Sequence, residues 1–318
     1  MNSLQEKLQS FKNNSNLYKK EHKTFDEQLQ ILKNRDLIIL NDDYVLTKLQ
    51  HINYYRLSAY FLPFQHNRNS SDKNKFLPNT NFETIIELYY FDVELRKIIF
   101  EAIESIEIHF RTQIAYYHAK SYKPLGYLEK ENFKTSEKFY SKVLGNFKNE
   151  SNRSEEEFIK HFENKYRTTD LPIWTLVEVI SFGTLSKLYT MLKTDEQKEV
   201  TKKLNGINNN VFQNWLHTLS VIRNICAHHS RLWNKTLGVK FEIPRKIKSF
   251  NQIKNERNMF MNDKIFFALS VIEYILTSIG EDEIDFKHKI KKLLKKYPNI
   301  DKNAMGFIDS WEELDIWK

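Results

Sequence analysis

The sequence predicts an all-α protein, and three observations support that fold class. The chain has 318 residues but 7 glycines and 6 prolines, which leaves little turn chemistry for a sheet with many tight turns. Its composition is 41% hydrophobic and 14% aromatic, enough to build one large folded domain or two ordinary ones. Apolar residues also recur at spacings of three and four along its longest patterned segments, as they do on one face of a helix.

The N-terminal part is expected to hold a small helical subdomain over residues 22–66, preceded by a flexible, polar terminus at 1–21. Thr24 is followed three residues later by Glu27, which is the pattern of a capping box, so a helix should begin there. The remaining predicted elements are, in order, a helix that Asp42 and Asp43 begin and that spans Tyr44–His51, an aromatic-rich segment at 52–61 and a polar loop at 65–80.

The longest periodic segment runs from Phe82 to about Lys120 and predicts a long helix. One face is apolar and consists of Leu95, Ile98, Ala102, Ile106, Phe110 and Ile114. Another face carries a polar stripe of Glu104, Glu107, Arg111 and His118. Glu107 and Arg111 stand four residues apart, the spacing at which an acid and a base pair on a helix.

The second half of the chain is also predicted to be mostly helical. A charged linker is expected at 146–157, followed by a helix Ile173–Leu192 that comes after Pro172 and contains Gly183. A turn at 205–210 then leads into a helix that Asn210 caps and that spans Val211 to about Leu232. The last expected elements are an irregular stretch at 235–250 with room for a short strand, a buried helix Ile265–Ile279, and a basic amphipathic helix Lys287–Lys296. Residues 81–280 form the predicted helical core, and 281–318 form a short C-terminal extension.

Composition narrows the classes of function. The 49 Lys and Arg residues outnumber the 41 Asp and Glu residues, and the net charge of +8 suits a partner rich in phosphate, although a solvated lysine-rich surface gives the same number. The single cysteine excludes an internal disulfide and a multi-cysteine zinc site. The N-terminal residues lack the apolar core of a signal peptide, and no stretch is apolar enough to span a bilayer, so we expect a cytoplasmic protein without membrane contact. No glycine-rich phosphate loop, zinc spacing or pair of catalytic carboxylates is present, and no cofactor or metal is expected.

Arg223 and His228 form a chemically sensible pair for cutting RNA without a metal. Histidine, with an ordinary pKa of about 6.5, can move a proton at the 2′-hydroxyl or at the leaving 5′-oxygen. Arginine offers a planar fork of donors to the charged phosphorane. The spacing alone does not identify a site, because Arg111 and His118 give a second match in a chain with ten histidines. A surface arginine and a core histidine with structural roles are the competing interpretation of either pair.

Helix geometry bears on how such a site could be built. At 100° per residue, His228 lies about 140° from Arg223 around an unbroken helix, so the two side chains diverge. Either the helix is distorted there or two chains contribute to one site. Asn224 stands four residues before His228 and shares its face, where it could orient the imidazole or hold the arginine.

The segment from Leu219 to Asn234, which reads LSVIRNICAHHSRLWN, resembles the signature of the Abi-type abortive infection proteins (the AbiD/AbiF-like group) of the HEPN ribonuclease superfamily. The resemblance extends over almost the whole chain from about residue 22. Its other stretches are Gln28–Leu32 with Arg35 and Leu37, residues 54–60, Phe91-Asp92 with Leu95-Arg96, Ile103 with Ile106-Glu107 and Arg111, Pro172–Trp174, residues 181–186, and Met305–Phe307 with Trp311 and Trp317. Asp36 and Ile308 depart from the glycine and the proline expected beside those stretches.

The resemblance implies a HEPN-like helical bundle, a homodimer and a metal-independent endoribonuclease whose site lies where two chains meet. Carried over by position, Arg223 stabilises the phosphate, His228 transfers the proton, Asn224 supports them and His229 is a candidate helper. RNA is the implied substrate, and a small noncoding RNA is an implied regulator. The alternative function is a non-catalytic RNA-binding protein that associates with such an RNA.

Three further features have both a functional and a structural interpretation. Glu107 and Arg111 could support the site from behind, or they could be an ion pair with a structural role. Tyr55 and Arg56 could stack on single-stranded bases, or they could pack between subdomains. The basic run 287–296 could follow an RNA backbone, or it could be a solvated helix face.

Overall fold

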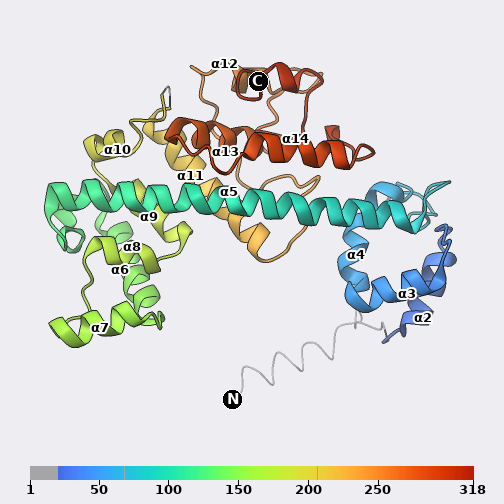
Figure 1. Ribbon diagram of the computed structural model, residues 1–318, viewed down its shortest axis with the longest axis horizontal. Coiled ribbons are helices and arrows are strands. Elements are labelled where there is room, and N and C mark those ends of the chain that lie inside the picture. The colour runs from blue at the N-terminus through green and yellow to red at the C-terminus, as the bar shows by residue number, and fades with distance from the viewer. Residues whose placement is uncertain (1–20, 68, 206) are drawn as a thin grey trace. The chain divides into compact units, whose positions relative to one another are not determined.

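The computed structural model describes residues 21–67, 69–205 and 207–318, so the predicted flexible terminus lies almost wholly outside the described residues. The all-α fold class is confirmed: the described residues contain thirteen α-helices and no strand, with three isolated β-bridges (Figure 1). None of the helices in these ranges is long and apolar enough to cross a membrane.

The chain separates into two compact units, the first ending at Tyr89 and the second beginning at Tyr90, within the long helix α5. The first unit contains α2 (Phe25–Lys33), α3 (Asp42–His51), α4 (Tyr54–Phe61) and the start of α5 (Phe82–Tyr122). The second contains the rest of α5, α6 (Glu137–Asn152), α7 (Glu157–Tyr166), α8 (Ile173–Val179), α9 (Phe182–Met191), α10 (Thr194–Val200), α11 (Asn209–Ala227), α12 (Lys248–Gln252), α13 (Ile265–Ile279) and α14 (Phe286–Lys296).

The first unit begins with the predicted capping box. The Thr24 hydroxyl accepts a hydrogen bond from the Glu27 N–H, and the Glu27 carboxylate accepts one from the Thr24 N–H. The predicted loop closes onto the helices through backbone bridges between Ile38 and Asn81 and between Gln65 and Phe76. These local contacts and a small buried core hold the unit together.

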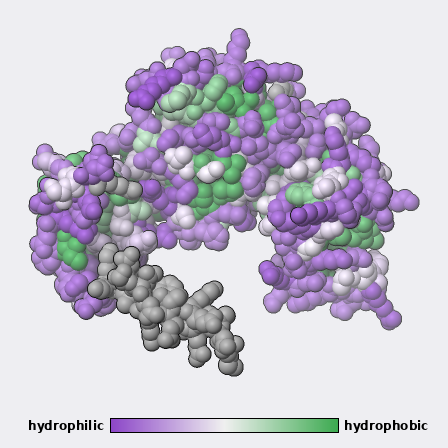
Figure 2. All heavy atoms as spheres, turned by 180° about the vertical axis from the view of Figure 1, so that it is seen from behind, coloured by the Kyte–Doolittle hydropathy of each residue, from purple (hydrophilic) through white to green (hydrophobic). Residues whose placement is uncertain are grey.

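The second unit is built around the rest of α5. Figure 1 shows α13 and α14 on one side of this helix and α6 and α8 on the other. Helix α11 packs on α9 and meets α5 through Phe110 and Phe212, whose ring centroids are 4.6 Å apart. Helix α13 is the predicted core helix, with the predicted bounds, and it is buried on nearly every side. Figure 2 shows one face of the molecule, which is mostly polar with apolar side chains gathered in separate patches.

Two predictions about the middle of the chain are wrong. The stretch 146–157 is not a linker, because α6 continues to Asn152 with Tyr140, Val143 and Phe147 buried on one face. The predicted helix Ile173–Leu192 is two helices that meet at Ser181. The Glu150 carboxylate of α6 accepts a hydrogen bond from the Ser181 N–H at 2.6 Å, and the Ser181 hydroxyl caps α9. A contact between distant segments therefore interrupts the apolar periodicity.

The bounds predicted for the motif helix also change. Its N-cap is Asn208 rather than Asn210, because the Asn208 side chain accepts the Val211 N–H. The helix ends at Ala227, five residues before the predicted Leu232. No strand forms in the described stretch 235–250, which is irregular and leads into α12.

Candidate functional site

The end of α11 is defined by hydrogen bonds around His229. The His229 N–H donates to the Cys226 carbonyl at 3.0 Å, and the Ser230 N–H donates to the Ile225 carbonyl at 3.0 Å. This is the bond pattern of a Schellman motif, whose turning residue takes a left-handed conformation. His229 occupies that position with φ 55°, where glycine is usual. The helix therefore ends at this turn, and both His228 and His229 are exposed.

Arg223 lies one turn before the end of α11 and points towards α5. Its Nε is 3.6 Å from Glu107 Oε2, and its guanidinium carbon is 5.7 Å from the centroid of the Phe100 ring. The side chain is 37% exposed. It forms one wall of a small cavity of about 180 Å³, whose other lining residues are Phe100, Glu104, Glu107, Ile108 and Arg111.

Glu107 and Arg111 form a buried ion pair on α5, directly behind Arg223. Glu107 Oε1 accepts a hydrogen bond from Arg111 Nη2, while Oε2 faces Arg223. One carboxylate thus holds two guanidinium groups. Because Arg223 faces Glu107 through Nε, its two Nη groups remain available for a phosphate. The structure brings together the three residues that the sequence had suggested as a group.

Arg223 lies within α11, and His228 is the C-cap residue of that helix. No hydrogen bond or ion pair joins their side chains in the part of the chain that the structure describes. Asn224 is exposed and accepts the His228 N–H through its backbone carbonyl at 2.9 Å. Helix α11 runs without interruption from Arg223 to Ala227 and ends before His228, so the divergence of the two side chains stays a prediction from helix geometry.

Asp92 anchors the segment that follows the motif, and sequence reasoning gave this residue no role. Its buried carboxylate accepts hydrogen bonds from the Leu232 N–H at 3.1 Å and the Trp233 N–H at 2.6 Å, and it pairs with buried Arg96. The available signal was an acid and a base four residues apart next to apolar positions of the predicted helix. Asp92 therefore fixes the backbone of Leu232 and Trp233, which follow the motif, to α5.

The second arginine–histidine match is structural. His118 is fully buried, with Nδ1 2.9 Å from Glu196 Oε1 and its ring stacked on Phe133. Arg111 is paired with Glu107 instead. The competing interpretation therefore holds for His118 as a core histidine, whereas Arg111 is a buried residue and not the surface arginine that it assumed.

Tyr55 and Arg56 belong to the first unit, on α4. Tyr55 is 85% exposed, so core packing does not account for this aromatic ring, whereas Tyr60 is buried. Arg56 is half-buried. Their suggested contact with RNA stays a prediction.

The basic helix α14 is largely occupied by ion pairs with neighbouring helices. Lys289 pairs with Glu101 and Lys296 with Glu94, both on α5, and Lys287 lies 3.9 Å from Glu273 of α13. These contacts favour a structural role for much of the run. Cys226 is buried, and burial raises the pKa of its thiol to about 12, which suits packing rather than nucleophilic chemistry.

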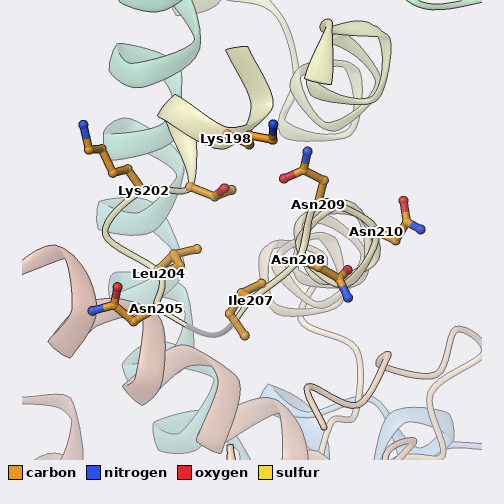
Figure 3. A pocket seen from close by; sticks show the side chains of 9 residues that line it. Lys198, Lys202, Leu204, Asn205, Ile207, Asn208, Asn209 and Asn210 are labelled. Atoms are coloured by element: carbon orange, nitrogen blue, oxygen red, sulfur yellow. The ribbon is translucent and has the colours of Figure 1, made fainter. Parts of the chain in front are cut away.

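A larger pocket of about 560 Å³ lies at the turn between α10 and α11. Figure 3 shows Lys198 and Asn209 reaching towards one another across it, with Lys202 directed outward. Lys198 pairs with Asp195 and Lys202 with Glu199, each on its own side of the pocket. The positive charge here is already balanced, so this pocket is a weaker candidate than the cavity beside Arg223.

Comparison with known proteins identifies a family. The family model described as Abi-like protein matches residues 47–234, more than half of the chain, and this range includes Asp92, Glu107, Arg223 and His228. No curated protein and no solved structure matches.

Proposed function

This chain belongs to the Abi-like protein family, which is linked to abortive infection, and we propose that it is a metal-independent endoribonuclease that acts in the cytoplasm during phage defence. One observation carries the proposal above the others. Arg223 is held by Glu107 with its Nη groups left for a phosphate, close to the helix end where the His228 imidazole is exposed.

The proposed reaction is an internal transfer at one phosphodiester bond. The 2′-oxygen forms a new bond to phosphorus as its proton passes to the His228 imidazole, and the bond from phosphorus to the 5′-oxygen breaks as that oxygen gains a proton. Arg223 stabilises the charge that develops on the phosphoryl oxygens. The products are a 2′,3′-cyclic phosphate and a 5′-hydroxyl. Asn224 supports the imidazole, and His229 is a candidate for the second proton transfer.

We further propose that two copies of the chain build each site. On an ideal helix Arg223 and His228 of one chain point about 140° apart, so a second copy would supply the missing group across a two-fold axis. RNA is the substrate in this proposal, and a small noncoding RNA is a candidate regulator because the net charge of +8 favours any RNA as a partner.

The proposal is tested by incubating the purified protein with mixed cellular RNA in EDTA. We expect cleavage with cyclic phosphate ends, and a loss of at least about a hundredfold in rate for both Arg223→Ala and His228→Ala. The matched control is His217→Ala, a histidine on the same helix outside the motif, which should cleave normally.

His229 needs a different substitution because its backbone is left-handed. His229→Gly removes the imidazole and keeps that conformation, so a loss of activity in this variant reports the side chain rather than the turn. Cleavage that survives both Arg223→Ala and His228→Ala would sink the ribonuclease proposal. RNA bound intact, with salt-sensitive affinity and no cleavage, would instead identify a non-catalytic RNA-binding protein.

A further inference from the structure

A groove with two exposed aromatic walls lies between α5 and α8. It has a volume of about 570 Å³ and is lined by Thr112, Ala115, Tyr116, Ala119, Lys120, Trp174, Val177 and Glu178. Tyr116 of α5 is 60% exposed and Trp174 of α8 is 51% exposed. Between them, the small side chains of Ala115 and Ala119 keep the floor low. The groove therefore offers flat aromatic surface beside an open floor.

Trp174 differs from the other tryptophans of the chain. All five lie within the described residues, and the other four are buried, namely Trp215, Trp233, Trp311 and Trp317. Leaving an indole in water forgoes the favourable burial of a large apolar surface. Trp174 also makes none of the ring contacts that the buried tryptophans Trp215, Trp311 and Trp317 make within the described ranges. An aromatic side chain left open in this way is suited to stack on a flat partner.

The rim of the groove carries the polar groups that a nucleobase edge would need. Lys120 and Glu178 are both exposed, and no ion pair joins them among the described side chains. A lysine ammonium donates to base carbonyls or to phosphate, and a glutamate accepts from an exocyclic amino group. A mostly apolar groove with a few polar groups at its edge is typical of a site for a small planar ligand.

The groove and the cavity beside Arg223 are both lined by residues of α5. Ile108 lines that cavity, and Thr112 and Tyr116 follow at successive steps of four residues, which places them along one side of the helix. Eight residues of helix separate Glu107 from Ala115, which is about 12 Å. A single RNA strand with one phosphate at Arg223 could therefore present a neighbouring base to the groove.

We propose that Trp174 and Tyr116 form a stacking subsite for an unpaired base of single-stranded RNA. The identity of the ligand as substrate rests on the proposed ribonuclease function. The favoured ligand is an unpaired base because stacking needs an open π face, which a base pair inside a duplex does not present. A second copy of the chain is the other occupant that this face could take, and the experiment below separates the two.

Tryptophan fluorescence reports binding at Trp174, because the other four tryptophans are buried and a ligand base cannot stack on them. The full chain carrying His228→Ala is titrated in EDTA with a single-stranded oligoadenylate, and separately with an abasic ribose-phosphate oligomer of the same length and charge. We expect the oligoadenylate to quench tryptophan fluorescence and the abasic oligomer to leave it unchanged. Trp174→Phe, which keeps an aromatic ring, should abolish the quenching while retaining most of the affinity.

Affinity is then measured by anisotropy in the same His228→Ala background. Trp174→Ala and Tyr116→Ala should each weaken oligoadenylate binding by about tenfold. Tyr166→Ala is the matched control, because Tyr166 is a similarly exposed tyrosine on α7 outside the groove, and it should bind normally. Circular dichroism melts confirm that each variant is folded.

Three results with the inactive protein would each overturn the subsite: equal quenching by the abasic oligomer, unchanged affinity in both alanine variants, or conversion of a dimer to a monomer by Trp174→Ala. The last would show that the groove is an interface between copies. The two proposals fail separately. If the unmodified protein cuts no RNA, the ribonuclease proposal fails while these binding data still decide the subsite. If Trp174→Ala in the active protein leaves KM for single-stranded RNA unchanged, only the subsite fails.

Discussion

At the scale of single residues, Glu107 is the centre of the candidate site. Its carboxylate pairs with buried Arg111 on one side and faces Arg223 on the other, so the same group stabilises the fold and orients the proposed phosphate ligand. A helix surface would have allowed Arg223 many rotamers. Glu107 and the Phe100 ring restrict them, which lowers the entropy that phosphate binding has to overcome.

We predict that Glu107→Ala lowers the free energy of unfolding by about 3–5 kcal/mol, because it leaves the Arg111 charge buried without a partner. Glu104→Ala is the matched control, since Glu104 is exposed on the rim of the same cavity, and it should change stability by less than about 0.5 kcal/mol. The double variant Glu107→Leu with Arg111→Leu should recover most of the loss. Urea unfolding measures the free energy of unfolding of the three variants. Equal losses in Glu107→Ala and Glu104→Ala would contradict the role of Glu107 as the buried partner of Arg111.

At the scale of elements, the position of the motif depends on how α11 ends. The left-handed turn at His229 stops the helix, and Asp92 fixes the next residues to α5 through two backbone hydrogen bonds. Together these contacts place His228 at an exposed helix end rather than on a continuous helix face. The position of the His228 imidazole therefore depends on the turn at His229 and on the hydrogen bonds to Asp92.

We predict that Asp92→Ala lowers the free energy of unfolding by about 3 kcal/mol or more, because Arg96 and two buried N–H groups lose their partner. Asp301→Ala is the control: Asp301 accepts the Ala304 N–H in the same way but is exposed, so about 1 kcal/mol or less is expected. Hydrogen exchange at Leu232 and Trp233 gives the local measure. If both amides stay protected in Asp92→Ala, Asp92 does not fix the Leu232 and Trp233 backbone to α5.

At the scale of the whole molecule, the candidate site is confined to the second unit. Asp92, Glu107, Arg223 and His228 all follow Tyr90, where that unit begins, whereas Tyr55 and Arg56 belong to the first. The proposed dimer is also a property at this scale, because the proposed site takes Arg223 from one chain and His228 from the other. A site shared between chains makes activity depend on which chains are paired.

We predict that two inactive variants restore activity when they are co-expressed. A dimer of one Arg223→Ala chain and one His228→Ala chain keeps one intact site, made of the arginine of one and the histidine of the other. At equal mixing half of the dimers are mixed, so about a quarter of the unmodified cleavage rate is expected. Each variant alone is the control. No recovery, with mixed dimers verified by two affinity tags, would show that a site takes both residues from one chain.

The sequence by itself determined the features that depend on near neighbours. The capping box at Thr24, the extent of α5 and the bounds of α13 follow from contacts within four residues and from an apolar periodicity that any helix must satisfy. The grouping of Glu107 with Arg111 belongs to the same class, because their spacing already makes them neighbours.

Only the tertiary structure decided the features that depend on distant segments. Glu150 breaks one predicted helix at Ser181, and Asp92 fixes the chain after α11 from a position 140 residues earlier. The contact of Arg223 with Glu107 likewise joins two helices, and the groove between Tyr116 and Trp174 exists because α5 meets α8. Such contacts arise from packing between elements, which leaves no fixed spacing in the sequence.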